Sequence, residues 1–384
     1  MKTYEQVDEY MQRIGLKYIK GSNEFITGLA VRTDKNYAMK IAEELNSRAN
    51  RQNDSNMVFY KMKNESLVAS IYISAAFDGG LFRHLGNLII DKPDLFNGRI
   101  IDMACDCGIV TCFIAQQYPQ CKITGVDVNS SAIENAKELA QKLGLSNVDF
   151  VCSDVYEYVA EEKADTVTSF RSLLDVTLAA VKDLPFFGEI KWREKQYCAA
   201  FEKYAKAIAD NLKPDGRVLS VERYTADYGW LGWMLSLEEH GVYSIPEECQ
   251  EMRASDISSV KDYTVTIAQK TGSTSTAEDS YCNVLIRSFK SGTGYDGYMA
   301  EFALNQDADG DITYYDIYKG DKILHQFASA VAKSGKVMYY EASGNKKRIK
   351  YANIKKKEAL DKDLEQKLQL YNTDEFSVKT YKIQ

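Results

Sequence analysis

A glycine and a carboxylate in the first half of the chain stand at a spacing that suits nucleoside binding. Gly108 closes the segment Ile100-Ile-Asp-Met-Ala-Cys-Asp-Cys-Gly, where a short apolar run passes into small and polar residues. Asp127 follows Gly108 by 19 residues, at the end of the next apolar run. In open α/β sheets the ligand lies beyond the carboxyl ends of the strands, where small residues let the backbone approach and an acidic side chain accepts ribose hydroxyls. Together the two features predict a nucleoside site.

The segments around these residues alternate between strand and helix. We expect strands at RIIDMA, KITGVDV, NVDFVCS, ADTVTSF and GRVLSVE, with helices over Ile109–Gln117, Ser130–Gly144 and a long stretch that ends at Asn211. In the second of these helices, Ser130 or Ser131 is expected to cap the start and Gly144 the end. Strands separated by helices predict a parallel, doubly wound α/β sheet.

Features at four places, in the correct order, resemble the class I S-adenosylmethionine-dependent methyltransferases. The first motif of that family commonly reads Asp-x-Gly/Ala-Cys-Gly-x-Gly, and the matching positions are Asp102, Ala104, Cys105 and Gly108. The other three features are the acidic Asp127, the Ser153-Asp154-Val155 turn and Leu212-Lys-Pro-Asp-Gly216. The resemblance covers half of the chain and implies a seven-stranded methyltransferase-type sheet that binds S-adenosyl-L-methionine. It assigns the cofactor to Asp102, Ala104, Cys105, Asp106, Gly108, Asp127, Val128, Asp154, Val155 and Phe170.

Asp106 departs from the family pattern, because it stands at the middle glycine of the first motif. Its carboxylate would attract the ammonium group of the cofactor and repel the cofactor's carboxylate. Its β-carbon would narrow the space in which the cofactor approaches the backbone. Two outcomes stay open. The chain is either an active enzyme with altered cofactor geometry, or a weak or inactive methyltransferase-fold module used for partner binding.

Acceptor-side residues are expected in loops at the strand ends, since the enzyme must hold an acceptor in line with a methyl group that is already electrophilic. A general base is needed only where the acceptor loses a proton. The candidates are Arg171, which follows the fourth strand with Phe170, then Glu222, Arg223 and Tyr224 after the fifth, and Asp78 and His84 before the core. A surface or capping role is the competing interpretation of His84.

Charge and motif content favour a small-molecule acceptor. The 384-residue chain has a net charge of −7, which disfavours polyanion binding by the molecule as a whole. A basic cluster at 344–357 contains no acidic residue and leaves methylation of RNA or a protein as an alternative. A nicotinamide-dependent oxidoreductase is disfavoured, because the glycine-rich loop that cradles a pyrophosphate is missing.

Changes in the residue pattern along the chain predict three domains. These are a mainly helical N-terminal lid or interaction segment at 1–96, a Rossmann-like core at 97–290 and a β-rich domain at 291–384 that ends in a charged helix. The runs DYTVTIAQK and YCNVLIRSF predict a hairpin that closes the sheet. GYMAEFALN predicts a further strand, joined by a turn at Asp307–Asp311 to the strand DITYYDIYK.

The sequence shows no clear sign of a signal peptide, a membrane span, a disulfide framework or a cysteine metal site. The N-terminus lacks the apolar stretch of a signal peptide and no later run reaches spanning length, so we expect a soluble cytoplasmic enzyme with no membrane partner. The eight cysteines are read as reduced thiols, and the close pair Cys105 and Cys107 lacks a second pair at ligand spacing, so no metal is expected. The oligomeric state stays open.

Overall fold

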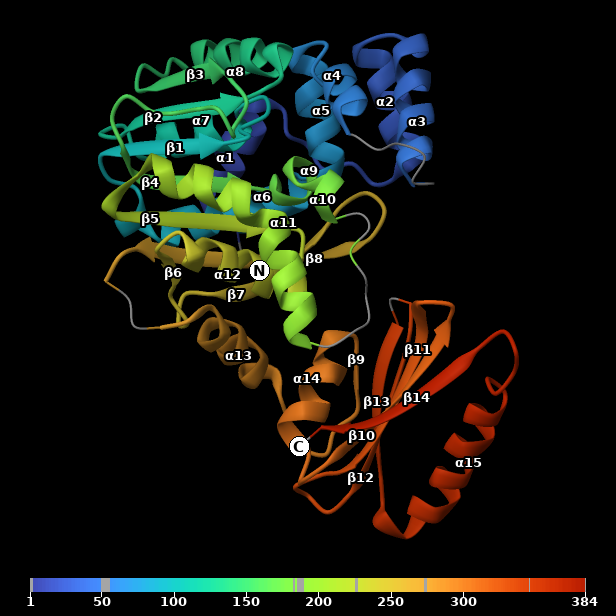
Figure 1. Cartoon of the computed structure of the whole chain (residues 1–384). Coiled ribbons are helices and arrows are strands. Elements are labelled where there is room, and N and C mark those ends of the chain that lie inside the picture. Colours follow the sequence, from blue (N-terminus) through green and yellow to red (C-terminus); the bar gives the residue numbers. More distant parts are fainter. Residues whose placement is uncertain are drawn as a thin grey trace. The chain divides into compact units, whose positions relative to one another are not determined.

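The computed structural model describes two compact units. The residues that it describes are 3–49, 56–181, 184, 190–224, 227–272, 275–344 and 346–383. Unit 1 comprises 1–183, 197–225 and 229–280, and unit 2 comprises 184–196, 226–228 and 281–384 (Figure 1). The helical N-terminal segment therefore shares a unit with the core that follows it.

Unit 1 is built on one mixed sheet with strand order β3-β2-β1-β4-β5-β8-β6, in which β7 also pairs with β8 (Figure 1). β1 to β5 are parallel, and β8 is antiparallel to β5, β6 and β7. This confirms the expected α/β class and its five parallel strands. The bounds are β1 (Arg99–Met103), β2 (Lys122–Asp127), β3 (Val148–Cys152), β4 (Ala164–Phe170), β5 (Leu212–Glu222), β6 (Val242–Ser244), β7 (Gln250–Ser255) and β8 (Val260–Lys270).

The sheet has eight strands in seven positions. β6 pairs with the end of β8 at Ala268–Lys270, whereas β7 pairs with its beginning at Val260–Val265. The two short strands thus share the free edge of β8 one after the other. The sheet thus has the seven strand positions that were expected, and two short strands, β6 and β7, occupy the position at one edge.

The helices of the core include those expected over Ile109–Gln117, over Ser130–Gly144 and up to Asn211. They are α7 (Ile109–Gln117), α8 (Ser130–Leu143), α9 (Leu173–Val176), α10 (Leu178–Val181), α11 (Ile190–Asn211) and α12 (Tyr228–Glu239), of which α9 and α10 were not predicted. The expected cap of α8 was wrong: Asn129 Oδ1, and neither serine, accepts from Ser131 N at 3.1 Å and Ala132 N at 3.4 Å. Gly144 ends the helix in the left-handed region at φ 71°, as expected.

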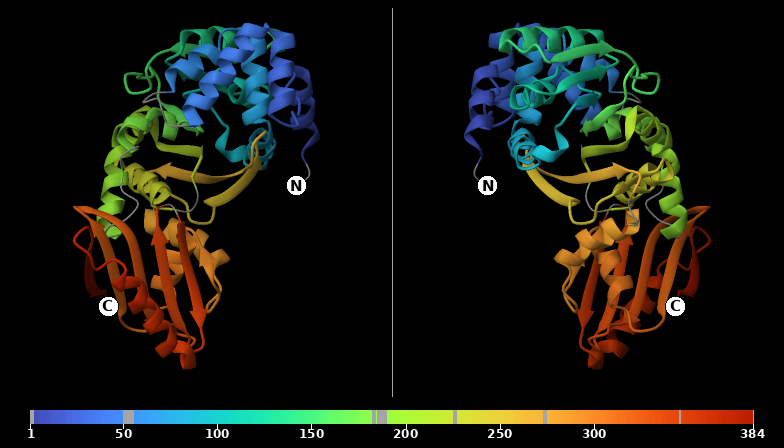
Figure 2. Two further views of the ribbon diagram at one scale, coloured as in Figure 1. Left: turned by 90° about the vertical axis from the view of Figure 1, so that its right-hand side faces the viewer. Right: turned by 90° about the vertical axis from the view of Figure 1, so that its left-hand side faces the viewer.

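In the described part of the N-terminal segment, six α-helices precede the core and pack into it. In Figure 2 the helices of the N-terminal segment, in blue, lie beside the core, in teal and green. α5 contacts α8 and α6 contacts α7, and Tyr10 donates a buried 2.6 Å hydrogen bond to the carbonyl of Ile109. None of the helices in the described ranges is both long enough and apolar enough to cross a membrane. The bounds are α1 (Glu5–Ile14), α2 (Ser22–Arg32), α3 (Lys35–Ala49), α4 (Met57–Lys63), α5 (Leu67–Phe77), α6 (Gly79–Asp91) and the short 3-10 helix η1 (Pro93–Leu95).

The predicted closing hairpin was wrong in its second half. DYTVTIAQK forms most of β8, but YCNVLIRSF falls mainly in the helix α13 (Ala277–Ser288). Tyr281, Val284 and Leu285 are buried at the i, i+3, i+4 spacing of a helix. Glu278 and Asp279 stand in its first turn, where negative charge stabilises a helix.

Unit 2 holds an antiparallel sheet of order β14-β10-β11-β12-β13-β9. One hydrophobic cluster joins α14 to this sheet, and a second joins α15 to it. The β-rich expectation is confirmed, but GYMAEFALN was wrongly predicted as a strand, because Ala300, Ala303 and Leu304 are buried at helical spacing. The bounds are β9 (Tyr295–Asp296), α14 (Tyr298–Asp307), β10 (Ile312–Lys319), β11 (Lys322–Val331), β12 (Val337–Ser343), β13 (Lys346–Ala352), η2 (Ile354–Lys356), α15 (Lys357–Gln369) and β14 (Ser377–Ile383).

A buried ion cluster lies inside unit 2. Glu301 of α14 pairs with Arg193 and with Lys347, and the three residues are at most 4% exposed. Burial by itself would raise the pKa of Glu301, but the charges of Lys347 and Arg193 outweigh it and lower that pKa. Arg193 also stacks over the ring of Tyr228 at 4.3 Å. Lys347, which belongs to the predicted basic cluster, is therefore buried in the interior of unit 2 and has a structural role there.

Candidate functional site

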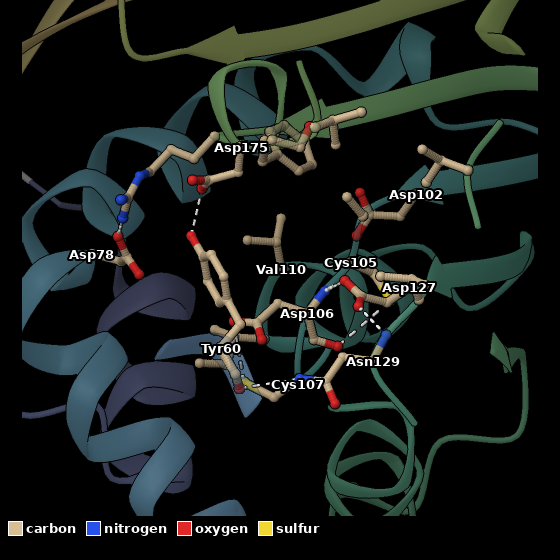
Figure 3. Close-up of a pocket in the computed structure, with 18 of the residues that line it drawn as sticks. Tyr60, Asp78, Asp102, Cys105, Asp106, Cys107, Val110, Asp127, Asn129 and Asp175 are labelled. Atoms are coloured by element: carbon tan, nitrogen blue, oxygen red, sulfur yellow. Dashed lines mark hydrogen bonds and ion pairs between the residues drawn. The ribbon is translucent and has the colours of Figure 1, made fainter. Parts of the chain in front are cut away.

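A cavity of about 450 Å³ opens at the carboxyl ends of the parallel strands in unit 1 (Figure 3). Its lining includes every residue that the sequence assigned to the cofactor except Gly108. α4 and α6 contribute further lining residues, as does the segment after β4. Among the described residues, no three His, Cys, Asp or Glu side chains converge in a way that could hold a metal ion.

Gly108 shapes the turn beneath the cavity. Its φ is +71°, and a β-carbon there would stand 2.9 Å from the β-carbon of Ala136 and 3.0 Å from the ring of Phe150. Its N–H donates to the carbonyl of Cys105 at 3.0 Å. Glycine is thus required both by the left-handed backbone and by the close packing of α8 and β3 against the turn.

Asp127 is held in a fixed orientation at the end of β2. Its Oδ2 accepts from the backbone N–H of Asp106 at 2.8 Å, and its Oδ1 accepts from the backbone N–H of Asn129 at 2.8 Å (Figure 3). Burial, and then the charge of Asp106, raise the pKa of Asp127 to about 6. The carboxylate therefore faces the cavity with both oxygens anchored and their remaining lone pairs available.

Asp102 anchors the start of the first motif from inside the sheet. It is 2% exposed and accepts from Thr111 Oγ1 at 2.5 Å and from Thr168 Oγ1 at 2.9 Å. Burial raises its pKa to about 6. These bonds tie β1 to α7 and to β4, so Asp102 fixes the loop that carries Ala104 and Cys105 at the cavity wall.

Asp106 adopts the left-handed conformation at φ 49°, which glycine would reach without strain. Its carboxylate faces α4, where it forms an ion pair with Lys63 and accepts from Asn64 Nδ2 at 2.7 Å. Ala104 also has a positive φ, of 57°. The first motif therefore keeps the backbone path of a glycine-rich turn although two of its residues carry side chains.

The wall beyond Asp127 combines apolar side chains with one carboxylate. Val128 is half exposed, Val155 is buried and Phe170 is partly buried. Asp154 Oδ1 accepts from the backbone N–H of Tyr156 at 2.9 Å, so Asp154 closes its own turn. Its other oxygen, Oδ2, accepts no hydrogen bond from the residues that the structure describes.

The N-terminal helices supply residues that sequence reasoning missed. Tyr60 of α4 donates a 2.5 Å hydrogen bond to Asp175, which follows β4, and Lys63 pairs with Asp106. The lining also takes apolar residues from α6, namely Leu81, Phe82 and Leu85. Figure 3 places Asp78, Tyr60 and Asp175 toward one end of the cavity, with Asp102 and Asp127 toward the other.

Of the acceptor-side candidates, only Phe170, Arg171 and Asp78 line the cavity. Arg171 forms an ion pair with Asp78, so these two residues join the end of β4 to the start of α6.

Glu222, Tyr224, Arg223 and His84 are absent from the lining. Glu222 is 1% exposed, and burial raises its pKa to about 8. It accepts from Ser169 Oγ at 2.6 Å and from the backbone N–H of Leu173 at 3.0 Å, which fits a structural support of α9. Burial lowers the pKa of the imidazole of His84, on α6.

Comparison with known proteins shows that the core is similar to methyltransferases. Residues 96–270 match the family model of a methyltransferase domain. The chain is 28% identical over 130 residues to the ribosomal RNA small subunit methyltransferase C of Actinobacillus pleuropneumoniae serotype 3 (strain JL03), which covers 33% of this chain and 38% of that protein. It is 31% identical over 85 residues to pavine N-methyltransferase of Thalictrum flavum subsp. glaucum, with coverage of 22% and 24%.

The chain is also 24% identical over 210 residues to the malonyl acyl-carrier protein O-methyltransferase of Priestia megaterium (strain DSM 319 / IMG 1521). This longer alignment covers 50% of this chain and 73% of that protein. The chain spans little more than a third of the length of the ribosomal RNA methyltransferase. The segment from 96 to 270 is thus similar to a methyltransferase domain, and the family model and these relatives support the resemblance to the class I S-adenosylmethionine-dependent methyltransferases.

Proposed function

We propose that this chain binds S-adenosyl-L-methionine in the cavity of unit 1 and transfers its methyl group to a small-molecule acceptor. The observation that carries the proposal is Asp127, whose two oxygens are each fixed by a backbone N–H at the cavity wall. A carboxylate offers about four acceptor positions, so each oxygen can still take one ribose hydroxyl.

The remaining wall suits the other parts of the cofactor. Val128, Val155 and Phe170 offer apolar surface to the adenine ring, and Asp154 can accept from its amino group. Asp102 and Cys105 support the turn, and Gly108 lets the turn pack closely. When bound, the cofactor supplies an electrophilic methyl group, and the protein's part is to hold the acceptor in line and exclude water.

The charge of the lining supports a small, uncharged or cationic acceptor. Among the lining residues that the structure describes, the cations are Lys63 and Arg171, and there are six aspartates. A negative cavity attracts the cofactor's sulfonium and repels a phosphate backbone. The aspartates are Asp78, Asp102, Asp106, Asp127, Asp154 and Asp175.

The acceptor end is the part of the cavity near Asp78 and Asp175, where α6 adds apolar side chains. Its mixture of apolar walls and a few polar groups is typical of small-molecule sites. Arg171, which lines this end, is proposed to position the acceptor through its ion pair with Asp78. His84, Glu222 and Tyr224 lie outside the lining, so they are not proposed to touch the acceptor.

Two alternatives receive less support. For an inactive module, the main argument was the charge of Asp106, and Lys63 pairs with that charge. For an RNA acceptor, the argument was the basic cluster, of which Lys347 is buried against Glu301 while Arg348 and Lys357 pair with Asp296 and Asp361.

Calorimetric titration with S-adenosylhomocysteine tests the cofactor site, and we expect a dissociation constant in the micromolar range. Absence of binding at about 1 mM ligand would refute the proposal. The acceptor class is tested by incubating the protein and tritium-labelled cofactor with small amines and alcohols, and in parallel with total RNA. Label transfer to RNA alone would overturn the small-molecule assignment.

A further inference from the structure

A buried lysine from the N-terminal helices reaches the first motif. Lys63, the last residue of α4, has a side chain that is 5% exposed, and it forms an ion pair with Asp106, whose side chain is 28% exposed. Both residues line the cavity. An ion pair of opposite charges thus occupies the wall where the family has a glycine without a side chain.

The pair keeps capacity to bind more groups. An ammonium has three N–H donors. Within the described part of the chain, Lys63 Nζ donates one hydrogen bond, to Asp106. Burial lowers the pKa of Lys63, but the charge of Asp106 and further contacts more than reverse this and raise it, so the lysine stays charged at neutral pH. Asp106 accepts from Lys63 and, at 4.0 Å, from Cys107 Sγ with Oδ2, and from Asn64 with Oδ1, which leaves a lone pair on Oδ1 for a further donor.

The pair is also held in place from behind. Asn64, which donates to Asp106, accepts from Ser70 Oγ at 2.8 Å through its Oδ1. Asn135 of α8 donates to Ser70 Oγ at 2.9 Å and to the carbonyl of Asn64 at 3.0 Å. This buried network ties the end of α4 to α5 and α8. The orientation of the pair is therefore set before any ligand arrives, which lowers the cost of binding.

We propose that Lys63 and Asp106 form a subsite for the zwitterionic amino-acid end of the cofactor, in which Lys63 binds the carboxylate and Asp106 binds the ammonium. The inference rests on the proposed function and deepens it. A lone aspartate would repel the cofactor's carboxylate, whereas the pair offers one opposite charge to each group of the zwitterion. Lys63 is thereby a specificity-determining residue that selects an α-amino acid end.

The test compares two ligands that share the adenosine part. S-adenosylhomocysteine carries the amino-acid end, and 5′-methylthioadenosine lacks it. Calorimetric titrations are run on the full chain, on Lys63→Met and on Lys63→Arg. Lys61→Met is the matched control, because Lys61 is an exposed lysine on the same helix.

We expect Lys63→Met to weaken S-adenosylhomocysteine about tenfold or more while 5′-methylthioadenosine changes less than about twofold. Lys63→Arg should keep the preference for S-adenosylhomocysteine, and Lys61→Met should alter neither affinity. Equal losses for both ligands, or no loss, would overturn the subsite while leaving the adenosine site intact. If the unaltered chain binds neither ligand, the proposed function itself fails.

A measurement on the unaltered chain covers the case in which Lys63→Met does not fold. The decarboxylated analogue of S-adenosylhomocysteine keeps the ammonium and lacks the carboxylate. We expect it to bind about tenfold or more weakly than S-adenosylhomocysteine. Equal affinity of the two ligands would mean that Lys63 does not bind the carboxylate, and it would overturn the proposal.

Discussion

Replacement of Asp127 by asparagine is the most direct test of the nucleoside site. The carboxylate accepts one backbone hydrogen bond on each oxygen, from Asp106 N and from Asn129 N. An asparagine has the same shape but offers one oxygen and one NH₂ group. The NH₂ group must face one of the two backbone donors, so one N–H loses its partner, and the face toward the cavity loses its negative charge.

The expected magnitude follows from these bonds. A hydrogen bond to a charged group contributes about 1.5–3 kcal/mol, so the loss of both ribose bonds in their charged form costs about 3 kcal/mol or more. This corresponds to a loss of affinity of about a hundredfold. The stability of the fold should change by less than about 2 kcal/mol, because removal of a buried charge partly offsets the orphaned N–H.

Calorimetry with S-adenosylhomocysteine and with 5′-methylthioadenosine measures the effect, and Asp127→Asn should weaken both ligands alike, since both carry the ribose. Asp165→Asn is a matched control: Asp165 also accepts from a backbone N–H, that of Arg99 at 2.8 Å, but it does not line the cavity. A loss of less than about fivefold in Asp127→Asn, with the fold intact, would refute the assignment of Asp127 to the ribose.

Three further predictions follow from the same structure. Because the pKa of Asp127 is raised to about 6 and the ionised form accepts the hydroxyls, affinity for S-adenosylhomocysteine should fall as the pH drops through 6 and level off above 7, and calorimetry on Asp127→Asn should show a flatter profile. Gly108→Ala should lower the free energy of unfolding in urea by about 2 kcal/mol more than Gly144→Ala, since both glycines have φ +71° but only at Gly108 would a β-carbon meet other atoms within 4 Å. Glu301→Ala should cost about 3–5 kcal/mol in the same assay, because it leaves Arg193 and Lys347 buried without their carboxylate. Asp296→Ala, which removes an exposed partner of Arg348, should cost less than about 1 kcal/mol.

The core could be predicted because a parallel strand is buried on both faces, and such a strand appears in the sequence as a short run of apolar residues. Ile100, Ile101 and Val126 are buried and sit in short apolar runs, and the helices between these runs show a period of 3.6 residues. α13 and α14 were misread because YCNVLIRSF, with Tyr, Val, Ile and Phe, and GYMAEFALN, with Tyr and Phe, suit a strand by residue type. The buried residues of α13 and α14 recur at helical spacing, but each helix has too few of them for the period to stand out in the sequence.

The site was predictable where it lies within one local stretch of chain. Asp102, Asp106 and Asp127 are placed by strand ends that the sequence itself marks. The N-terminal contributions were not predictable in this way: Lys63 lies 43 residues before Asp106, and Tyr60 lies 115 residues before Asp175. α4 has only seven residues, and the pairing depends on how α4 packs in three dimensions.

Lys63 and Asp106 explain each other, although neither is informative alone. Asp106 in place of glycine brings a charge and a left-handed backbone into the motif for which we propose binding of a zwitterion. Lys63 by itself would be a buried cation, and burial of an unpaired charge costs several kcal/mol. Together the two charges cancel at the wall and still present one cation and one anion to the cavity. The aspartate that argued against activity in the sequence is paired with Lys63 in the structure, and in the proposed subsite the two charges match the amino-acid end of the cofactor.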